Sequence, residues 1–250
     1  KSFICIDDKE LRKILPKIHK KNFLTYGFSK KSNFQILNTK YKSNFSTFDL
    51  GFMSSDSTKK IIRKIKINLI GKHNVLNAAA AVSLCLHLGI KLHVIKNSLK
   101  KFTGIDRRLT KVFQIKEREF YDDYAHHPTE IKSVLRSLKN TSGNRKIIAV
   151  FQPHRYSRLS LLKKDFSLSF KDSDTVILCP VYAAGEKTDR KYDEVKFSKM
   201  IAKNSDVQVI IIKNEIDLKK YFIKNILRDE IVICMGAGSI SKWIREMKIK

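Results

Sequence analysis

The stretch FQPHRYSR, residues 151–158, places His154, Arg155 and Arg158 directly after the apolar run KIIAVF. Such a run is typical of a short buried strand, so the polar cluster would lie at the carboxyl end of that strand. The planar guanidinium of arginine suits the bidentate binding of carboxylates and phosphates. The cluster is therefore either an anion-binding site or a solvated loop, and the ends of the other strands decide between the two.

Three further peptides of unusual composition follow predicted strands: DDYAHHP at residues 122–128, YAAGE at 182–186 and GAGSI at 236–240. In a parallel, doubly wound sheet, ligands bind outside the carboxyl ends of the strands. Because all these peptides would lie along that edge, we interpret them together as one site.

The peptides also have structural interpretations. Asp122 and Asp123 could cap the helix that follows them, although they lie several residues too early. His126 and His127 are adjacent and point apart, and no third ligand has a recognisable spacing, so we predict no metal site. GAGSI lacks the third glycine of a dinucleotide-binding motif and follows the last predicted strand instead of the first.

A second group of polar residues, His73, Asn74 and Asn77, lies on the first turns of a helix predicted after Gly71. An asparagine amide carries both a donor and an acceptor, which matches the edge of an adenine base. The alternative interpretation is an ordinary helix surface.

Strands and helices alternate in the second part of the chain, which predicts an α/β fold with a parallel, doubly wound sheet. The expected strands are residues 119–122, 146–151, 175–181, 207–212 and 231–235. The expected helices are residues 129–139, 159–170, 195–204 and 215–225.

The first part of the chain is mixed. Strands are expected at residues 3–6, 22–26, 34–41, 45–52 and 61–70. Helices are expected at residues 7–15, after Gly71 as far as Gly89, and at 91–101. We take the loop FTGIDRR as the boundary between two domains, residues 1–105 and 106–250.

Composition sets broad limits. With 250 residues, of which 42% are hydrophobic, the chain can bury a substantial core. It has neither a run of about 18 apolar residues nor a signal-peptide pattern, so we predict no membrane segment. Its four cysteines stand singly in apolar runs, which favours reduced core thiols of a cytoplasmic protein.

The formal net charge of +27 fits a nucleic-acid-binding protein, but the distribution of the charge does not. Lysines outnumber arginines 39 to 12 and are scattered along the chain, as in proteins from AT-rich genomes. No nucleic-acid-binding motif accompanies them, so we expect no specific nucleic-acid partner. The arginines instead cluster at 107–108 and 155–158, which suggests a function in anion binding.

Read in order, six motifs of the chain closely resemble the Mur ligases of bacterial cell-wall synthesis: GKHNVLNAAAAVSLCLHLGI, FTGIDRRL, DDYAHHPTEI, FQPHRYSRL, VYAAGE and GAGSI. The resemblance runs essentially from end to end and includes ICIDD and LTYGF near the start. Within the family, DDYAHHPTEI with FQPHRYSR resembles the members that join L-alanine to UDP-N-acetylmuramate. Ligases that recycle murein tripeptide share DDYAHHPT but are expected to differ around FQPHRYSR.

The resemblance implies a fold and a reaction. Residues 1–105 would be the C-terminal part of the central, ATP-binding domain, and residues 106–250 a Rossmann-like domain that binds the amino acid. ATP would phosphorylate the lactyl carboxylate of UDP-N-acetylmuramate, and the amine of L-alanine would attack the resulting acyl phosphate. Nearly all charge in these steps is anionic, so the site needs preorganised cations and hydrogen-bond donors.

The resemblance also assigns roles to residues. The amino acid and the acyl group would be held in a pocket formed by Tyr124, His126, His154, Arg155 and Arg158. The nucleotide would be bound at its adenine by His73, Asn74 and Asn77, at its ribose by Asp123, and at its phosphates by Arg107 or Arg108. The chain departs slightly from the family at Leu109, where phenylalanine is usual.

The larger departures from the family are elements that this sequence lacks. It contains no glycine-rich phosphate loop of the G-x-x-x-x-G-K-[ST] type, no UDP-sugar-binding domain, and no magnesium-binding carboxylate and histidine of the central domain. We therefore expect a C-terminal portion that is inactive alone and requires a complementing N-terminal half, which would also hold Mg²⁺. The alternatives are a decayed remnant with exposed strand edges and apolar faces, or a basic nucleic-acid-binding module.

Overall fold

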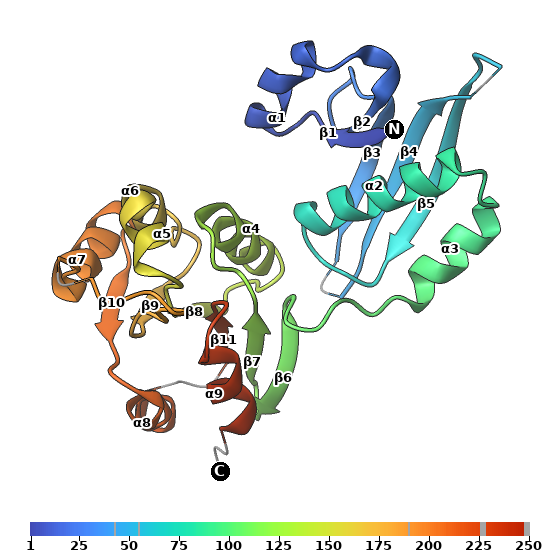
Figure 1. Cartoon of the computed structure of the whole chain (residues 1–250). Helices are drawn as coiled ribbons and strands as arrows, with labels where there is room; N and C mark the ends of the chain where they lie inside the picture. Colours follow the sequence, from blue (N-terminus) through green and yellow to red (C-terminus); the bar gives the residue numbers. More distant parts are fainter. Residues whose placement is uncertain (43, 55, 190, 226–228, 248–250) are drawn as a thin grey trace. The chain divides into compact units, whose positions relative to one another are not determined.

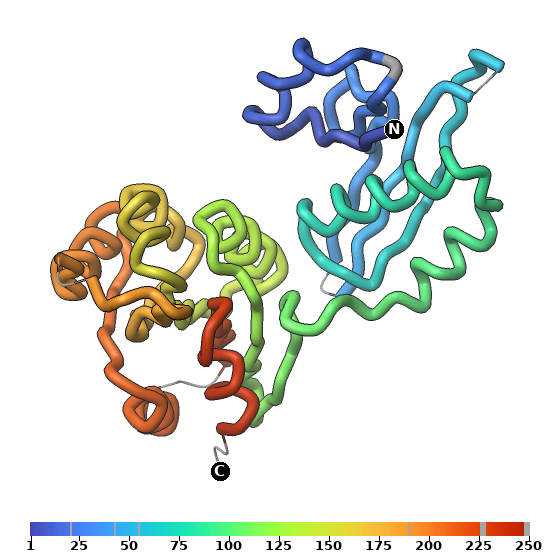
Figure 2. Tube along the Cα trace, in the orientation of Figure 1, coloured from blue at the N-terminus to red at the C-terminus, as the bar shows by residue number. Residues whose placement is uncertain are grey.

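The computed structural model describes residues 1–42, 44–54, 56–189, 191–225 and 229–247, without the side chain of residue 21. The chain forms two compact units, Lys1–Gly104 and Ile105–Lys250. Figure 2 follows the chain by colour through the first unit, from blue to green, and then through the second, from green to red. None of the helices in the described ranges has both the length and the apolar composition that a bilayer crossing requires.

In its described residues, the first unit contains a five-stranded sheet in the order β1-β2-β3-β4-β5 (Figure 1). Strands β1 to β3 run parallel, and β4 and β5 continue the sheet antiparallel. The strands are β1 (Ser2–Cys5), β2 (Phe23–Gly27), β3 (Phe34–Tyr41), β4 (Ser46–Met53) and β5 (Lys59–Ile67). The helices are α1 (Lys9–Ile14), the 3-10 helices η1 (Leu15–Lys17) and η2 (Lys20–Asn22), α2 (Lys72–His87) and α3 (Leu92–Lys101).

Helix α2 packs on this sheet through one face. Val75, Ala79 and Val82 are buried, and their spacing of three and four residues places them on one side of the helix. They meet Phe48 and Leu50 of β4, which are fully buried in the same core. The small side chain of Ala79 lets the helix approach the sheet closely. The lysines of β5 are exposed.

The acidic pair that ends the ICIDD motif organises the start of the first unit. Asp8 caps α1 by accepting the amides of Glu10 and Leu11. Asp7 accepts the amides of Phe28 (2.7 Å) and Ser29 (3.2 Å), just beyond β2. Helix α1 therefore begins two residues later than expected, because the first aspartate ties β1 to β2 and the second is the cap.

The second unit is built on a six-stranded sheet in its described residues, in the order β10-β9-β8-β11-β7-β6. Five strands are parallel, and β6 pairs antiparallel with β7 at one edge. The strands are β6 (Thr110–Ile115), β7 (Arg118–Asp123), β8 (Lys146–Phe151), β9 (Thr175–Leu178), β10 (Gln208–Ile211) and β11 (Glu230–Met235). The helices are α4 (Pro128–Lys139), α5 (Tyr156–Leu161), α6 (Lys163–Ser167), α7 (Glu194–Ser205), α8 (Glu215–Asn225) and α9 (Ile240–Glu246).

Helices cover both faces of this sheet, which confirms the predicted α/β, doubly wound architecture (Figure 1). Along β8, Ile147 and Phe151 face the core formed with α4, α6 and α7, whereas Ile148 and Val150 face the core formed with α8 and α9. A strand buried on both faces reads as a continuous apolar run, which is why KIIAVF shows no polar alternation. The thiols of the buried Cys179 and Cys234 are free, and burial raises the pKa of both.

Several predicted elements differ from the structure. The single helix expected at 159–170 is two helices, α5 and α6, because Leu162 between them leaves helical geometry (φ −111°, ψ 20°). The strand expected at 175–181 ends at Leu178, two residues before a proline that cannot donate to a ladder. Strand β6 and helix α9 were not predicted at all. The strand expected at 61–70 lies instead at Lys59–Ile67.

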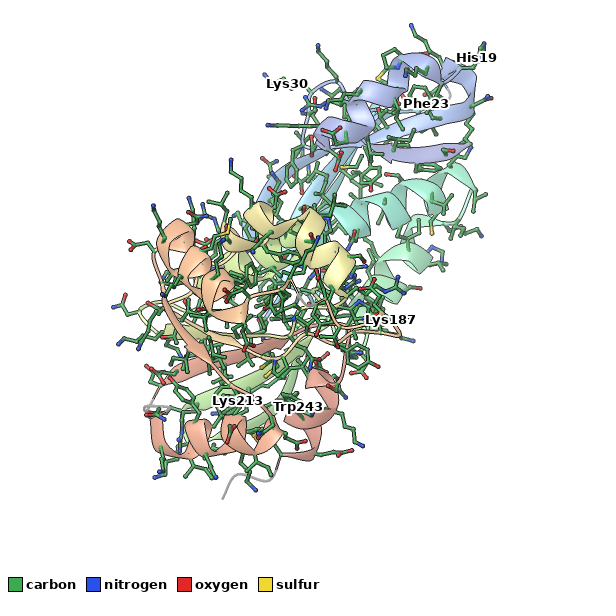
Figure 3. The ribbon with its side chains drawn as sticks, turned by 60° about the vertical axis from the view of Figure 1, so that its left-hand side comes forward. His19, Phe23, Lys30, Lys187, Lys213 and Trp243 are labelled. Atoms are coloured by element: carbon green, nitrogen blue, oxygen red, sulfur yellow. The ribbon has the colours of Figure 1, made fainter. Side chains whose placement is uncertain are left out.

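The lysines responsible for most of the positive charge are spread over the surface. Lys30, Lys187 and Lys213, labelled in Figure 3, are exposed and belong to three separate loops. Scattered exposure of this kind keeps each ammonium group solvated.

Candidate active site

The polar peptides of the second unit lie along one edge of its sheet, as predicted. Met235 at the end of β11 is in register with Asp123 at the end of β7 and with Phe151 at the end of β8. Phe151 is in turn in register with Leu178 of β9. The loops that follow these strands therefore start side by side at the carboxyl edge of the sheet.

The carboxylate of Asp123 holds the first of these loops in place. One oxygen accepts the amide of Ala125 and the other that of Leu109, each at 2.7 Å. The residue is only 2% exposed, and burial raises its pKa to about 6, against the opposing effect of the two amides and Arg108. Asp123 does not cap α4, so the capping interpretation of this residue is wrong.

Helix α4 is capped by other residues of the same motif. The His127 ring accepts the amide of Thr129 (3.3 Å), and the Glu130 carboxylate accepts the amides of His126 (3.0 Å) and His127 (3.2 Å). This reciprocal arrangement is a capping box. It fixes the backbone of His126, whose Nδ1 lies 2.9 Å from the carbonyl oxygen of Tyr124.

Aromatic rings from three loops form a row along the edge. The ring centroids are 5.1 Å apart for Tyr124 and His126, 5.9 Å for His126 and His154, and 5.6 Å for His154 and Tyr182. The row thus joins two histidines predicted for the site with Tyr182, which was not predicted as a site residue. The Arg107 guanidinium lies 4.7 Å above the Tyr124 ring, and that of Arg108 lies 5.9 Å above it.

The FQPHRYSR loop places two arginines beside this row. Arg158 Nη1 lies 3.3 Å from Nδ1 of His154. Burial, followed by the charge of Arg158, lowers the pKa of His154, so its imidazole is neutral at physiological pH. Arg155 precedes α5 with a positive φ of 69°, and its amide donates to the carbonyl oxygen of Tyr182 (2.9 Å). Arg155 is exposed and Arg158 half-buried, so both remain within reach of a ligand.

Two contacts that were not predicted hold the remaining loops. Glu186 of YAAGE accepts hydrogen bonds from the amide and the hydroxyl of Ser157, which ties that loop to the first turn of α5. Gln152 is 2% exposed, accepts the amide of Ile240 (3.0 Å) and donates to Ser239 (3.0 Å). Its position directly after a buried strand is the feature of the sequence that could have identified Gln152.

The glycines of GAGSI are explained by close packing. At Gly238, a Cβ atom would lie 2.6 Å from the Gln152 side-chain oxygen and still closer to the Tyr182 ring. At Gly236, where φ is +154°, it would lie 2.8 Å from the carbonyl oxygen of Gln152. The resemblance of this peptide to a dinucleotide-binding motif therefore follows from backbone packing against the β8 loop.

The predicted adenine-binding residues lie in the first unit. Asn74 donates its side-chain amide to the carbonyl oxygen of Ile70 (2.8 Å), across the start of α2. Asn77 lies one turn further along the helix and is exposed, and His73 is half-buried. The structure thus brings together the predicted residues of the second unit, and the three residues on α2 form a separate group.

No group of three histidine, cysteine, aspartate or glutamate side chains in the described ranges is arranged to hold a metal ion.

Comparison with known proteins extends these observations. The Mur ligase middle domain model matches residues 1–85, and the Mur ligase, glutamate ligase domain model matches residues 107–238. The UDP-N-acetylmuramate–L-alanine ligase of Pelagibacter ubique is 47% identical over 247 residues, which cover 99% of this chain and 53% of that protein. The ligase of the same name from Brachyspira hyodysenteriae is 39% identical over 98% of this chain and 52% of its own length.

Solved structures agree with these relatives. UDP-N-acetylmuramate-alanine ligase MurC from Thermotoga maritima superposes with a TM-score of 0.70 at 26% identity, over 89% of this chain and 46% of that one. A murein peptide ligase from Psychrobacter arcticus shares the fold, with a TM-score of 0.66 at 17% identity. The chain spans about half the length of the curated relatives it matches. Since one family model alone matches more than half of its residues, the chain belongs to the Mur ligase family.

Proposed function

We propose that this chain supplies the amino-acid side and the adenine side of a ligase that uses ATP to join L-alanine to UDP-N-acetylmuramate. The proposal rests chiefly on the cationic and aromatic row at the sheet edge, where Arg155 and Arg158 flank a neutral His154. It is supported by the ligases of that name to which the chain is similar over almost its full length.

In this proposal, the arginines bind carboxylate. Arg158 points its guanidinium toward His154, and α5 and the Glu186 contact fix the backbone from which it extends. A fixed arginine fork can hold the carboxylate of L-alanine through two parallel hydrogen bonds. Because the guanidinium of Arg158 can only donate, Nδ1 of the neutral His154 accepts from it, and the Nε2–H of His154 can then donate a hydrogen bond to the bound amino acid or acyl group.

The substrate carboxylate has to be activated before that attack. ATP would supply the phosphoryl group that converts the lactyl carboxylate into an acyl phosphate, and the amine would displace phosphate from it. Tyr124 and His126 would line the pocket in which the acyl group lies. The anionic charge that develops would be stabilised by Arg155 and Arg158, which follow His154 at the carboxyl edge of the sheet.

The adenine side would lie on α2. Because the Asn74 amide nitrogen already donates to Ile70, its oxygen would accept a hydrogen bond from the exocyclic amino group of adenine. The exposed Asn77 amide would supply both a donor and an acceptor, with His73 beside it. By the family resemblance, the ribose hydroxyls would be bound at Asp123, whose carboxylate also holds the amides of Leu109 and Ala125.

Mg²⁺ prefers carboxylate and water oxygens at nearly octahedral geometry. The described residues do not provide a cluster of such ligands. We propose that the metal ligands, the phosphate-binding loop and the UDP-sugar site belong to a complementing N-terminal half. Residues 1–105 would then act as part of the central domain and residues 106–250 as the amino-acid-binding domain.

Complementation tests this function. The chain would be combined with the part of the Pelagibacter ubique relative that it does not match, and ADP release would be measured with UDP-N-acetylmuramate, L-alanine, ATP and magnesium. We expect no turnover by the chain alone and turnover that requires all substrates after complementation. Turnover by the chain alone, or none with a complement that is shown to associate, would refute the proposal.

A further inference from the structure

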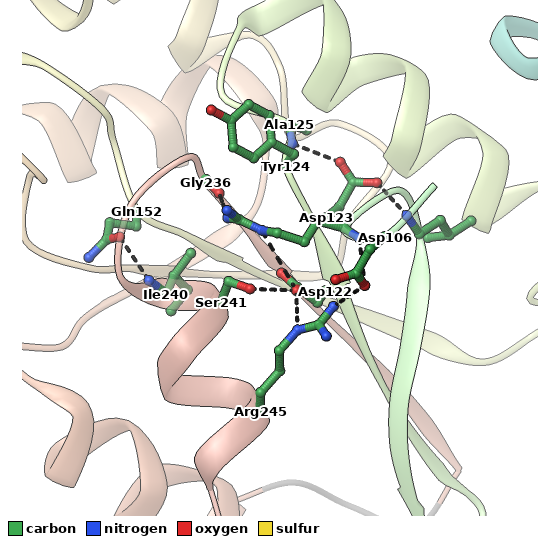
Figure 4. Close-up of polar contacts among 12 residues, drawn as sticks. Asp106, Asp122, Asp123, Tyr124, Ala125, Gln152, Gly236, Ile240, Ser241 and Arg245 are labelled. Carbon is green, nitrogen blue, oxygen red and sulfur yellow. Dashed lines mark hydrogen bonds and ion pairs between the residues drawn. The ribbon is translucent and has the colours of Figure 1, made fainter. Parts of the chain in front are cut away.

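A buried carboxylate lies directly beneath the candidate site. Asp122, next to Asp123 on β7, is completely buried. Its Oδ2 accepts the hydroxyl of Ser241 (2.6 Å) and Nε of Arg245 (2.8 Å), both on α9 (Figure 4). A buried charge requires such partners, because an unpaired carboxylate in a protein interior is strongly unfavourable.

Arg245 bonds two carboxylates at once. Its Nε donates to Asp122, and its Nη2 donates to Asp106 in the loop before β6. The planar guanidinium makes this possible, because its donors project in fixed, different directions. Helix α9, close to the end of the described chain, therefore fixes the segment that carries Arg107 and Arg108.

Arg107 is held within this arrangement by contacts of three kinds. Its Nη2 donates to the carbonyl oxygen of Gly236 (2.7 Å), its Nε lies 3.8 Å from Asp122 Oδ2, and its guanidinium covers the Tyr124 ring at 4.7 Å. Its carbonyl oxygen also accepts the amide of Tyr124 (2.7 Å). The residue adopts a positive φ of 59°, a conformation that a non-glycine residue keeps only when its surroundings hold it there.

Arg108 is more exposed than Arg107 and is held by weaker contacts. Its side chain is 48% exposed, against 25% for Arg107. Its ionic partner in the described residues, Glu130, is 3.7 Å away, and its guanidinium is 5.9 Å from the Tyr124 ring centroid. Exposed pairs at such distances are weak, so an anion can readily displace Glu130.

We infer that Arg245 is a positioning residue: through Asp122 and Asp106 it fixes Arg107 as a strut between Tyr124 and Gly236, and it leaves Arg108 as the arginine that contacts an anionic ligand. That this anion is a nucleotide phosphate rests on the proposed function. The strut itself depends only on the contacts of Arg107 with Tyr124, Gly236 and Asp122. It joins the loops after β7 and β11, so the Tyr124 end of the aromatic row is held before ligand binds.

Arginine modification by phenylglyoxal tests the strut without any assay of activity. In the wild-type chain, mass spectrometry should show Arg108 reacting roughly tenfold faster than Arg107. This ratio is expected if Arg107 must first break its charge-assisted hydrogen bond to the carbonyl oxygen of Gly236. Asp122→Asn keeps the shape of the side chain but removes the charge that pairs with Arg245 and Arg107, so the rate of Arg107 should rise toward that of Arg108. Equal rates for the two arginines in the wild-type chain, or an unchanged Arg107 rate in the Asp122→Asn variant, would overturn the inference.

Variants of Arg245 test the positioning role in the complemented ligase. Arg245→Lys keeps one charge but cannot bond both aspartates, so we expect a KM for ATP raised roughly tenfold and a KM for L-alanine within about twofold. Arg245→Gln should show a larger effect of the same kind. The matched control is Lys242→Ala, an exposed position on the same helix whose lysine pairs only weakly with Glu246, at 4.0 Å.

These results separate positioning from general destabilisation. A structural defect alone would lower the amount of active enzyme and leave both KM values unchanged, and that outcome would overturn the positioning role. So would equal effects of Arg245→Lys and Lys242→Ala. If the complemented wild-type ligase shows no turnover, the proposed function fails, whereas the modification rates still report on Arg107.

Discussion

Replacing Asp123 by asparagine should change how the stability of the second unit depends on pH. Burial raises the pKa of this carboxyl from 3.8 to about 6. A carboxyl with a higher pKa in the folded than in the unfolded state binds more protons when folded. It therefore stabilises the fold below its unfolded pKa, and this contribution is lost as the pH rises through about 6.

The size of the effect follows from the shift. The full difference between the two pKa values corresponds to about 3 kcal/mol, of which about 2 kcal/mol falls between about pH 4 and about pH 7. Asparagine does not titrate, and it also loses one of the two acceptors that hold Leu109 and Ala125. That second loss is independent of pH and costs about 1–3 kcal/mol.

The assay is urea unfolding followed by the fluorescence of Trp243, the single tryptophan of the sequence, which lies on α9 in the second unit. The difference in unfolding free energy between wild type and Asp123→Asn cancels the titration of the other groups. We expect the advantage of the wild type to shrink by about 2 kcal/mol between about pH 4 and about pH 7. An advantage that is constant, or that grows with pH, would refute the reasoning.

Three further predictions concern the site and the charge. In the complemented ligase, Arg158→Lys should lower alanine-dependent turnover roughly 30- to 150-fold, because lysine cannot form two parallel hydrogen bonds and losing one costs about 2–3 kcal/mol. Lys164→Ala, at an exposed position on α6, should change turnover less than about twofold, and similar effects at both positions would mean a solvated loop. Gln152→Leu leaves the buried amide of Ile240 without its acceptor and should lower the unfolding free energy by about 2 kcal/mol, measured in urea; equal stability would show that this contact is dispensable. Duplex DNA should bind only at low salt and without sequence preference in a fluorescence-anisotropy titration, so sequence-selective binding at physiological salt would contradict the account.

The sequence predicted the elements whose patterns are set by burial. Strand β8 has the predicted bounds because all of its residues but Lys146 are buried, and a doubly buried strand leaves an unbroken apolar run. Strand β6 was not predicted because it is a half-buried edge strand, in which the exposed Lys111 and Gln114 leave only a short apolar pattern. The prediction of one continuous helix was wrong partly because Leu161 continues the apolar pattern of α5. In the structure this leucine is 83% exposed.

The same division holds for the candidate site. Residues at the carboxyl ends of strands could be predicted, because a parallel sheet brings those ends together whatever the details of packing. Arg245 could not be found in this way, since its partner Asp122 lies more than a hundred residues earlier in the chain and nothing local marks the pair. The difference between Arg107 and Arg108 could not be predicted either, because it depends on the contact of Arg107 with the distant Gly236.

An isotope-transfer experiment tests the central claim most directly. The complemented ligase would receive UDP-N-acetylmuramate with a heavy oxygen isotope in its lactyl carboxylate, together with L-alanine, ATP and magnesium. If the carboxylate is activated as an acyl phosphate and then attacked by the amine, one labelled oxygen leaves with the inorganic phosphate, and mass spectrometry detects both labelled phosphate and the L-alanyl amide. Amide product with unlabelled phosphate, or ATP hydrolysis without amide product, would contradict the account.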